Sequence, residues 1–192
     1  MTRVYIVDAF TTDQPFSGNP AGVCILDDWP SDQWMQSIAA ELNHSETAFL
    51  VKEKSNKTND PHVKIRYFTP TTEVPLCGHA TLASAHVLAK ENYLSDQERG
   101  SKIQFTAKGG ELEVDIQNND IQMRFPKSSS QLIDDIESLP LNNLNLSPIN
   151  IYQSENALIY ELESETAIHS YTPNILAMTQ LKPMMHIITA KS

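Results

Sequence analysis

The sequence feature that most constrains this chain is a predicted helix built largely from small residues, between Gly78 and Asn92. Alanine recurs through the segment, and Ser84 stands near its middle. Alanine favours a helix, and small side chains let neighbouring elements come close enough to form a dense interior around it. We therefore expect this helix at the centre of a domain and not on its surface.

Short apolar runs on both sides of this helix are typical of β-strands. Turns expected at Gly109-Gly110 and Asn118-Asn119 would join the last three strands into a meander. The expected strands are Val4–Ala9, Ala21–Leu26, Thr47–Val51, Val63–Phe68, Ile103–Thr106, Glu111–Ile116 and Ile121–Phe125.

A second helix is expected between the second and third of these strands. Ser31 is a suitable N-cap. The large apolar residues Trp34, Ile38 and Leu42 then recur at intervals of four, which predicts an amphipathic helix.

The composition shifts between Pro126 and Pro148 towards Ser, Asn, Asp and Pro, which is typical of a domain boundary. We therefore expect one domain at residues 1–125 and part of a second at 126–192. The elements expected after the boundary are short helices near Gln131–Ser138, Glu165–Ser170 and Pro173–Thr179, with strands at Asn156–Leu162 and Met185–Ala190.

The chain is acidic, with 14 Lys and Arg against 24 Asp and Glu residues and a formal net charge of −10. Nucleic acids and anionic membranes do not attract such a surface, so neither is expected as a partner. We find no apolar run long enough for a transmembrane helix and no signal-peptide pattern at Met1–Tyr5. The two cysteines, Cys24 and Cys77, form no disulfide framework. These features favour a cytoplasmic protein with free thiols.

Three short segments could carry chemistry, although each also has a purely structural interpretation. Phe16–Gly22 is also typical of a tight turn. Asn43–Phe49 places the carboxylate of Glu46 between a helix and a strand, where solvated loop acids are common. Pro75–Thr81 leads into the small-residue helix, whose free N–H groups and positive dipole end favour an anion such as a carboxylate. His79 is then either a catalytic group or a histidine that simply occupies a helix start.

No metal site and no cofactor are expected from the sequence. The histidines and cysteines have none of the usual ligand spacings, and the glycine pairs do not match a nucleotide-binding pattern. Cys24 and His86 are expected to be packed structural residues.

Five motifs follow one another along the chain: Asp8–Thr11, Phe16–Gly22, Ser45–Phe49, Arg66–Pro70 and Cys77–Thr81. This ordered series closely resembles the PhzF-like family, which takes its name from a phenazine-biosynthesis isomerase, and the resemblance covers essentially the whole chain. It implies an α/β (α+β) fold shared with diaminopimelate epimerase and proline racemase. In that fold two similar halves each wrap a curved sheet round a central helix, and the active site lies in the cleft between them.

The resemblance also implies an isomerase or epimerase that moves a proton on a small carboxylated substrate without a cofactor. The family's acid/base residue corresponds to Glu46, its active-site histidine corresponds to His79, and Gly78 would offer the substrate a backbone contact. Cys77 falls where the related epimerases and racemases place one of two catalytic thiols, although that position is not the usual base in PhzF-like proteins. The expected substrate-binding positions are Asn19, Ser45, Cys77, Gly78 and Ala80.

Members of the family continue beyond the position of Ser192, so we expect the second half to be incomplete. Without its central helix, the apolar residues of the strands at Asn156–Leu162 and Met185–Ala190 would lack a cover, which predicts a homodimer. The alternative function is that of a catalytically inactive homologue that only binds or dimerises, because groups that act as a unit lose nearly all catalysis together.

Overall fold

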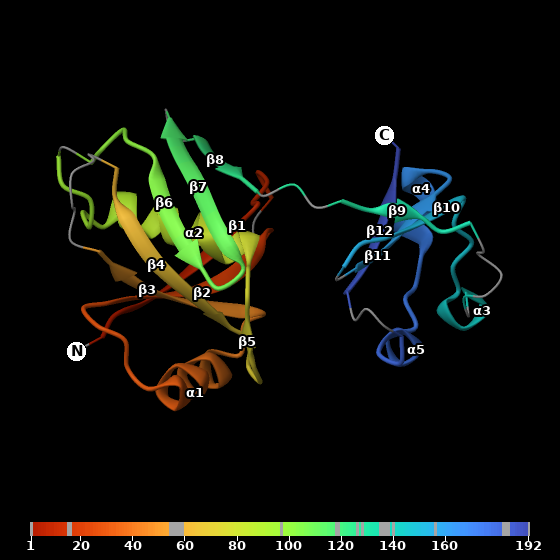
Figure 1. Cartoon of the computed structure of the whole chain (residues 1–192), viewed down its shortest axis with the longest axis horizontal. Coiled ribbons are helices and arrows are strands. Elements are labelled where there is room, and N and C mark those ends of the chain that lie inside the picture. The colour runs from red at the N-terminus through yellow and green to blue at the C-terminus, as the bar shows by residue number, and fades with distance from the viewer. Residues whose placement is uncertain are drawn as a thin grey trace. The chain divides into compact units, whose positions relative to one another are not determined.

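The computed structural model describes residues 2–14, 17–53, 60–96, 98–117, 120–125, 127, 129–134, 139, 141–155, 157–181 and 185–191. The chain forms two compact units, residues 1–126 and 127–192 (Figure 1). The expected Asn118-Asn119 turn and Phe16 lie outside the described residues.

The first unit is built on an eight-stranded mixed sheet in the order β1-β2-β3-β4-β6-β7-β8, with β5 paired to β4. Two neighbouring pairs, β2–β3 and β4–β6, are parallel, and the other pairs are antiparallel. The strands are β1 (Val4–Ala9), β2 (Asn19–Leu26), β3 (Glu46–Lys52), β4 (His62–Phe68), β5 (Glu73–Val74), β6 (Ile103–Ala107), β7 (Gly110–Gln117) and β8 (Asp120–Arg124).

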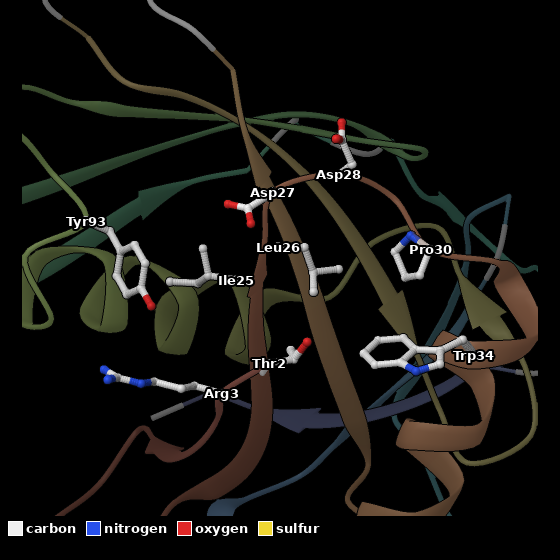
Figure 2. A pocket seen from close by; sticks show the side chains of 9 residues that line it. All are labelled: Thr2, Arg3, Ile25, Leu26, Asp27, Asp28, Pro30, Trp34 and Tyr93. Atoms are coloured by element: carbon white, nitrogen blue, oxygen red, sulfur yellow. The ribbon is translucent and has the colours of Figure 1, made fainter.

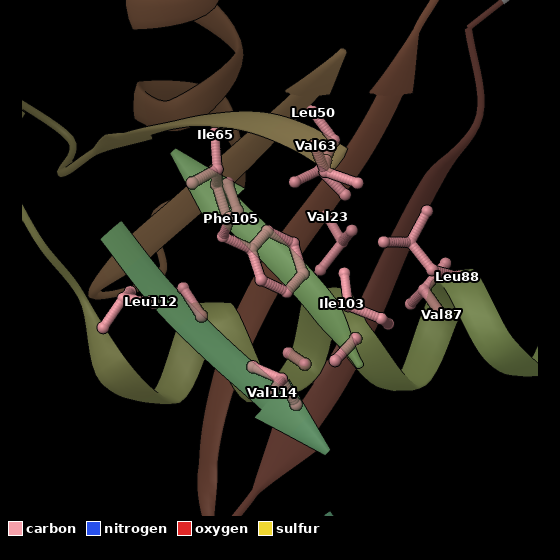
Figure 3. Packing of buried hydrophobic residues seen from close by; sticks show 14 of the residues in the cluster. Val23, Leu50, Val63, Ile65, Val87, Leu88, Ile103, Phe105, Leu112 and Val114 are labelled. Carbon is pink, nitrogen blue, oxygen red and sulfur yellow. The ribbon is translucent and has the colours of Figure 1, made fainter. Parts of the chain in front are cut away.

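The small-residue helix, α2 (Gly78–Lys90), lies inside the curve of this sheet, as the sequence predicts (Figure 1). It contacts β1, β2 and β3 at one end of the strand order and β8 at the other, so the sheet curls round it as a half-barrel. Val87 and Leu88 pack against apolar side chains of the strands, including Ile103 and Phe105 of β6 (Figure 3). The small side chains of Ala80, Ala83 and Ala85 are almost fully buried, which explains why this helix tolerates neighbours on nearly every side.

Polar groups on α2 are satisfied within the interior. The Thr81 hydroxyl donates to the Cys77 carbonyl at 2.7 Å and lies 2.6 Å from the Tyr67 hydroxyl, while Ser84 donates to the Ala80 carbonyl at 2.6 Å. Buried hydroxyls with partners avoid the cost of desolvation without compensation, so the helix can be central despite its polar residues.

Helix α1 (Asp32–Leu42) begins and ends as its sequence requires. The Ser31 side chain accepts from the Trp34 N–H at 3.3 Å, which confirms the predicted N-cap. Met35 and Ala39 pack into a cluster with Cys24 and two aromatic residues of the sheet, so Cys24 is a core residue as expected. Asn43 ends the helix in the left-handed conformation (φ 52°), which is easier for Asn than for most residues. The chain then enters β3 at once.

The second unit has its own four-stranded sheet, in the order β12-β11-β10-β9, and its own apolar cluster. The expected helix near Gln131–Ser138 is wrong at its start, because Gln131–Leu132 pairs with β10 as strand β9. This pairing satisfies backbone groups that a single helical turn would leave free; residues 135–138 lie outside the described part. The elements are β9 (Gln131–Leu132), α3 (Leu141–Leu144), β10 (Asn150–Gln153), β11 (Ala157–Leu162), α4 (Glu165–Ser170), α5 (Ile175–Met178) and β12 (Met185–Ala190).

The expectation that the strands of this unit lack a cover is wrong for β11. Leu158, Tyr160 and Leu162 are buried in a cluster that includes Leu144 and Met178 of the short helices. Residues of α3 and α5 thus cover the sheet locally. In β12, however, Met185 and Ile187 remain exposed. The homodimer therefore stays a prediction, with less exposed apolar surface behind it than the sequence indicated.

Candidate active site

The candidate site begins where two parallel strands start. Strands β2 and β3 pair with Ala21 opposite Glu46, so their amino ends lie at the same edge of the sheet. This arrangement brings Asn19 beside Ser45, although 26 residues separate them, and the Ser45 hydroxyl donates to the Asn19 side-chain oxygen at 3.3 Å. The parallel pairing therefore unites two segments that the sequence analysis considered separately.

The start of α2 supplies the third segment. The Nε2 atom of His79 lies 3.2 Å from the Ser45 hydroxyl and 3.6 Å from Oε2 of Glu46. The other ring nitrogen, Nδ1, lies 3.2 Å from the Cys77 sulfur. One imidazole thus touches a hydroxyl, a carboxylate and a thiol.

Burial sets the protonation states of this cluster. Desolvation lowers the pKa of His79 from its ordinary 6.5, while the neighbouring Glu46 carboxylate acts in the opposite direction. Desolvation also raises the pKa of the Cys77 thiol to about 12, and Glu46 adds to that effect. At neutral pH the imidazole is therefore uncharged and the thiol keeps its proton.

The contacts of His79 are compatible with one tautomer in particular. A thiol that donates to Nδ1 leaves the ring hydrogen on Nε2, which faces Ser45 and Glu46. The Ser45 oxygen can accept that hydrogen because its own hydroxyl donates to Asn19. In this tautomer the hydrogen bonds run from His79 through Ser45 to Asn19. The Cys77 thiol also has Glu46 as a hydrogen-bond partner.

Glu46 is the accessible member of the cluster. Its side chain is 21% exposed, against 9% for His79. Within the described part of the chain its carboxylate forms no ion pair with a lysine or arginine. The site therefore presents a carboxylate next to a neutral hydrogen-bond donor.

The predicted substrate-binding positions differ in what they expose. Ala80 is fully buried, so only its backbone could reach a ligand. Gly78 lies beneath the ring of Phe125, because a Cβ atom at position 78 would come within 2.7 Å of that ring. A larger residue at position 78 would therefore displace the Phe125 ring, which is 53% exposed.

Phe125 and Met123 are the neighbours of the site that the sequence analysis missed. Both approach Gly78 from the end of β8, and Phe125 remains 53% exposed. The available signal was a large aromatic residue at the end of a predicted strand beside a polar boundary, which is too common to single out.

The Arg66–Pro70 motif has a structural role in this fold. Arg66 makes a bidentate contact with Glu73 at 2.7 and 3.0 Å and a further one with Asp32 at 2.8 Å. Tyr67 is buried against α2. This motif holds β4 to β5 and α1.

Other cavities of the first unit lie away from this cluster. One, of about 560 Å³, is lined by Arg3, Trp34, Tyr93 and residues at the far end of β2 (Figure 2). Another, of about 460 Å³, is lined by residues that include Phe10, His86 and Asp120. The sequence analysis expected His86 to be packed in the interior, but its side chain borders this cavity. Neither contains Glu46 or His79.

Comparison with known proteins identifies the family of the chain. Residues 7–192 match the PhzC-PhzF family model, described as phenazine biosynthesis-like protein. The chain belongs to the PhzC-PhzF family. Two curated relatives are each named uncharacterized isomerase: one from Halalkalibacterium halodurans is 36% identical over 100% of this chain and 68% of its own length, and one from Pseudomonas aeruginosa is 40% identical over 96% and 66%. The chain thus spans about two thirds of the length of these relatives.

Solved structures agree with the PhzC-PhzF assignment. A Clostridium difficile protein of the PhzC/PhzF type is 38% identical, with a TM-score of 0.79 over 100% of this chain and 70% of that protein. A PhzF family protein from Enterococcus faecalis is 35% identical, with a TM-score of 0.71 over 95% of this chain and 65% of that protein. A hydroxyproline epimerase from Agrobacterium vitis, at 10% identity and a TM-score of 0.53 over 84% of this chain and 51% of that protein, shares the fold alone.

Among the described helices none is long and apolar enough to cross a membrane.

Proposed function

We propose that this chain is an isomerase that moves a proton on a small carboxylated substrate, with Glu46 as the acid/base. The observation that supports this most directly is the partly exposed Glu46 carboxylate, which lies 3.6 Å from a neutral His79. A carboxylate without a cationic partner can accept a proton and give it back, which is what general acid–base catalysis requires.

His79 would act as a donor and not as a second base. Its lowered pKa keeps it neutral, and its Nε2–H faces the space shared by Glu46 and Ser45. A neutral donor stabilises negative charge that develops on a substrate oxygen when an adjacent carbon loses its proton. Ser45 and Asn19 would hold the ring in this tautomer.

The substrate's own carboxylate would lie at the start of α2. The first N–H groups of a helix have no partner within the helix, and the dipole places positive charge there. The acidic balance of the whole chain does not prevent this, because the local field of the site decides how an anion binds.

Glu46 approaches a substrate from one side, so it would remove and return a proton on the same face. Movement of a proton between two carbons of a conjugated or cyclic acid needs no group on the opposite face, whereas inversion at one carbon does. The proposal therefore covers an isomerisation that Glu46 could perform alone and an epimerisation that would use a second group.

Solvent exchange tests this function. The chain is incubated in D₂O with a panel of small unsaturated and amino-acid-like carboxylates, and deuterium incorporation is followed by NMR. We expect incorporation with at least one carboxylate, no incorporation with its methyl ester, and loss of incorporation in Glu46→Gln. Binding of a carboxylate without any exchange would instead support the non-catalytic alternative, a binding module.

A further inference from the structure

The cluster at the start of α2 also has the composition of a metal site. Glu46, Cys77 and His79 each offer one ligand atom, and these atoms lie within 4.8 Å of one another. Sequence spacing does not reveal this set, because Cys77 and His79 are only two residues apart at the start of α2 and Glu46 comes from the start of β3. The fold creates it by placing the start of β3 against the start of α2.

The distance between the Cys77 and His79 ligand atoms is close to that of a tetrahedral zinc site. Bond lengths of about 2.3 Å to sulfur and 2.0–2.1 Å to nitrogen imply a separation of about 3.6 Å between the two ligand atoms. The Cys77 sulfur and His79 Nδ1 are 3.2 Å apart, so a small rotation of either side chain would admit the ion between them. The Glu46 carboxylate, whose Oε2 faces Nε2 of His79, would have to turn towards Nδ1 to complete the three ligands.

A second observation supports the same ion. Metal-bound histidines almost always donate their other ring N–H to a nearby acceptor, which fixes the ring. Here Ser45 lies 3.2 Å from Nε2 and is itself held by Asn19. His79 is thus already oriented to present Nδ1 to a metal.

The mixture of donors selects the kind of ion. Magnesium and calcium take oxygen ligands, whereas a thiolate with an imidazole suits zinc and similar borderline-soft ions. We propose that Glu46, Cys77 and His79 bind Zn²⁺ through three protein ligands, and that the bound ion blocks the isomerase site.

The binding step balances as an exchange of a proton for a metal. The S–H bond of Cys77 breaks, its proton passes to the buffer, and a Zn–S bond forms without oxidation or reduction. The ion then occupies the carboxylate and the ring that would otherwise act on a substrate. The blocking effect rests on the proposed function, whereas the binding itself does not.

Cobalt spectroscopy tests the binding independently of catalysis. Co²⁺ is added to the reduced full chain, and the near-ultraviolet band of thiolate-to-cobalt charge transfer is recorded together with the visible bands of tetrahedral cobalt. We expect both in the wild type, displacement of both by Zn²⁺, and no charge-transfer band in Cys77→Ser. The matched control is Cys24→Ala, which removes the chain's other thiol and should keep the band.

Two outcomes would overturn the site: no charge-transfer band in the wild type, or a band that survives Cys77→Ser. Circular dichroism would confirm that each variant is folded.

Competition with a chromophoric chelator gives a second measure of binding. Ser45→Ala should weaken Zn²⁺ binding about 10–100-fold, as the loss of a residue that orients a metal ligand does elsewhere. His44→Gln should not change the affinity. Equal binding by Ser45→Ala and the wild type would contradict the orienting role.

The two proposals can fail separately. If cobalt binds as expected but no carboxylate exchanges deuterium, the metal site stands and the isomerase function falls. If exchange is found and Zn²⁺ leaves it unchanged at concentrations that saturate the site, the blocking effect is refuted. If exchange is found and stops with Zn²⁺, then recovers on chelation, both stand.

Discussion

Among the polar clusters of the first unit that contain carboxylates, two differ most clearly in how far those carboxylates are neutralised. In one, Arg66 makes contacts of 2.7 to 3.0 Å with Glu73 and Asp32, and its guanidinium also lies 5.2 Å from the ring centre of Phe68. In the other, Glu46 lies 3.6 Å from the nearest ring nitrogen of a neutral His79.

The difference separates a group that holds the fold from a group that is free to react. A carboxylate matched by a bidentate arginine has its charge and geometry committed to that pair. A carboxylate next to a neutral donor keeps its lone pairs available. We infer that a carboxylate without a cationic partner at the end of a strand, and not the number of polar residues, distinguishes the cluster that is proposed to react.

The strongest test of this comparison is Glu46→Gln. We expect turnover to fall by a factor of about 10²–10⁴, the usual contribution of a positioned acid or base. Stability should change by less than about 0.5 kcal/mol, because no tight pair is lost. Deuterium exchange and urea denaturation measure the two effects, with the exposed Glu41→Gln as the matched control for both. A variant that kept full turnover would remove Glu46 from its role.

Arg66→Met should show the opposite pattern. It leaves Glu73 and Asp32 without their shared cation. We expect the free energy of unfolding to fall by about 1–3 kcal/mol, between the effects of breaking an exposed and a buried ion pair. Exchange rates measured well below the melting temperature should stay near those of the wild type. If activity fell while stability held, the two clusters would not be separable in this way.

Glu73→Gln sharpens the same comparison with a smaller change. It keeps the shape of the side chain but removes the charge from the bidentate contact, so we expect a loss of about 1 kcal/mol. The difference between this variant and Arg66→Met in urea denaturation measures what Arg66 contributes beyond its charge pair with Glu73, through Asp32 and the Phe68 ring. Equal losses would mean that these further contacts contribute nothing.

The smallest expected effect is a separation of the two clusters by pH. His79 has a pKa lowered from 6.5 by burial, so the unfolded chain takes up the proton first and stability declines as the pH falls below about 6.5. Glu73 has a pKa lowered from 4.5 by Arg66, so its stabilisation is present above about pH 4.5 and is lost as the pH falls further. Denaturation from pH 8 to pH 3.5 should show that His79→Gln flattens the first decline and Arg66→Met flattens the second. A first decline that persists in His79→Gln would mean that another group causes it.

The regular parts of this fold could be predicted from the sequence because their patterns are local. The small residues of α2 indicated a central helix, and Ser31 indicated where α1 begins; both are confirmed. Strand β9 was missed because two residues give no periodicity, and only pairing with β10 makes them a strand. The helices near Glu165–Ser170 and Pro173–Thr179 were expected and are confirmed as α4 and α5, but their packing onto β11 was missed because a sequence pattern does not show which elements meet in space.

The members of the site could be named from the sequence, but their contacts could not. The resemblance pointed to Glu46 and His79, and the spacing of residues said nothing about which ring nitrogen faces which neighbour. The pairing of Cys77 with Nδ1 and of Ser45 with Nε2 depends on where the start of α2 lies against the sheet. Phe125 was missed for the same reason, since its position over Gly78 is a property of the curled sheet.

The parallel pairing of β2 with β3 also has a consequence for the order in which the site assembles. The contacts of Ser45 with Asn19 and His79 span 26 and 34 residues of chain. Contacts at such separation form only after the intervening segments have given up much of their freedom, which makes them slow to appear during folding. The Glu46 carboxylate and the His79 imidazole are therefore apart in a nascent or partly unfolded chain, and the proposed site exists only once the sheet is complete.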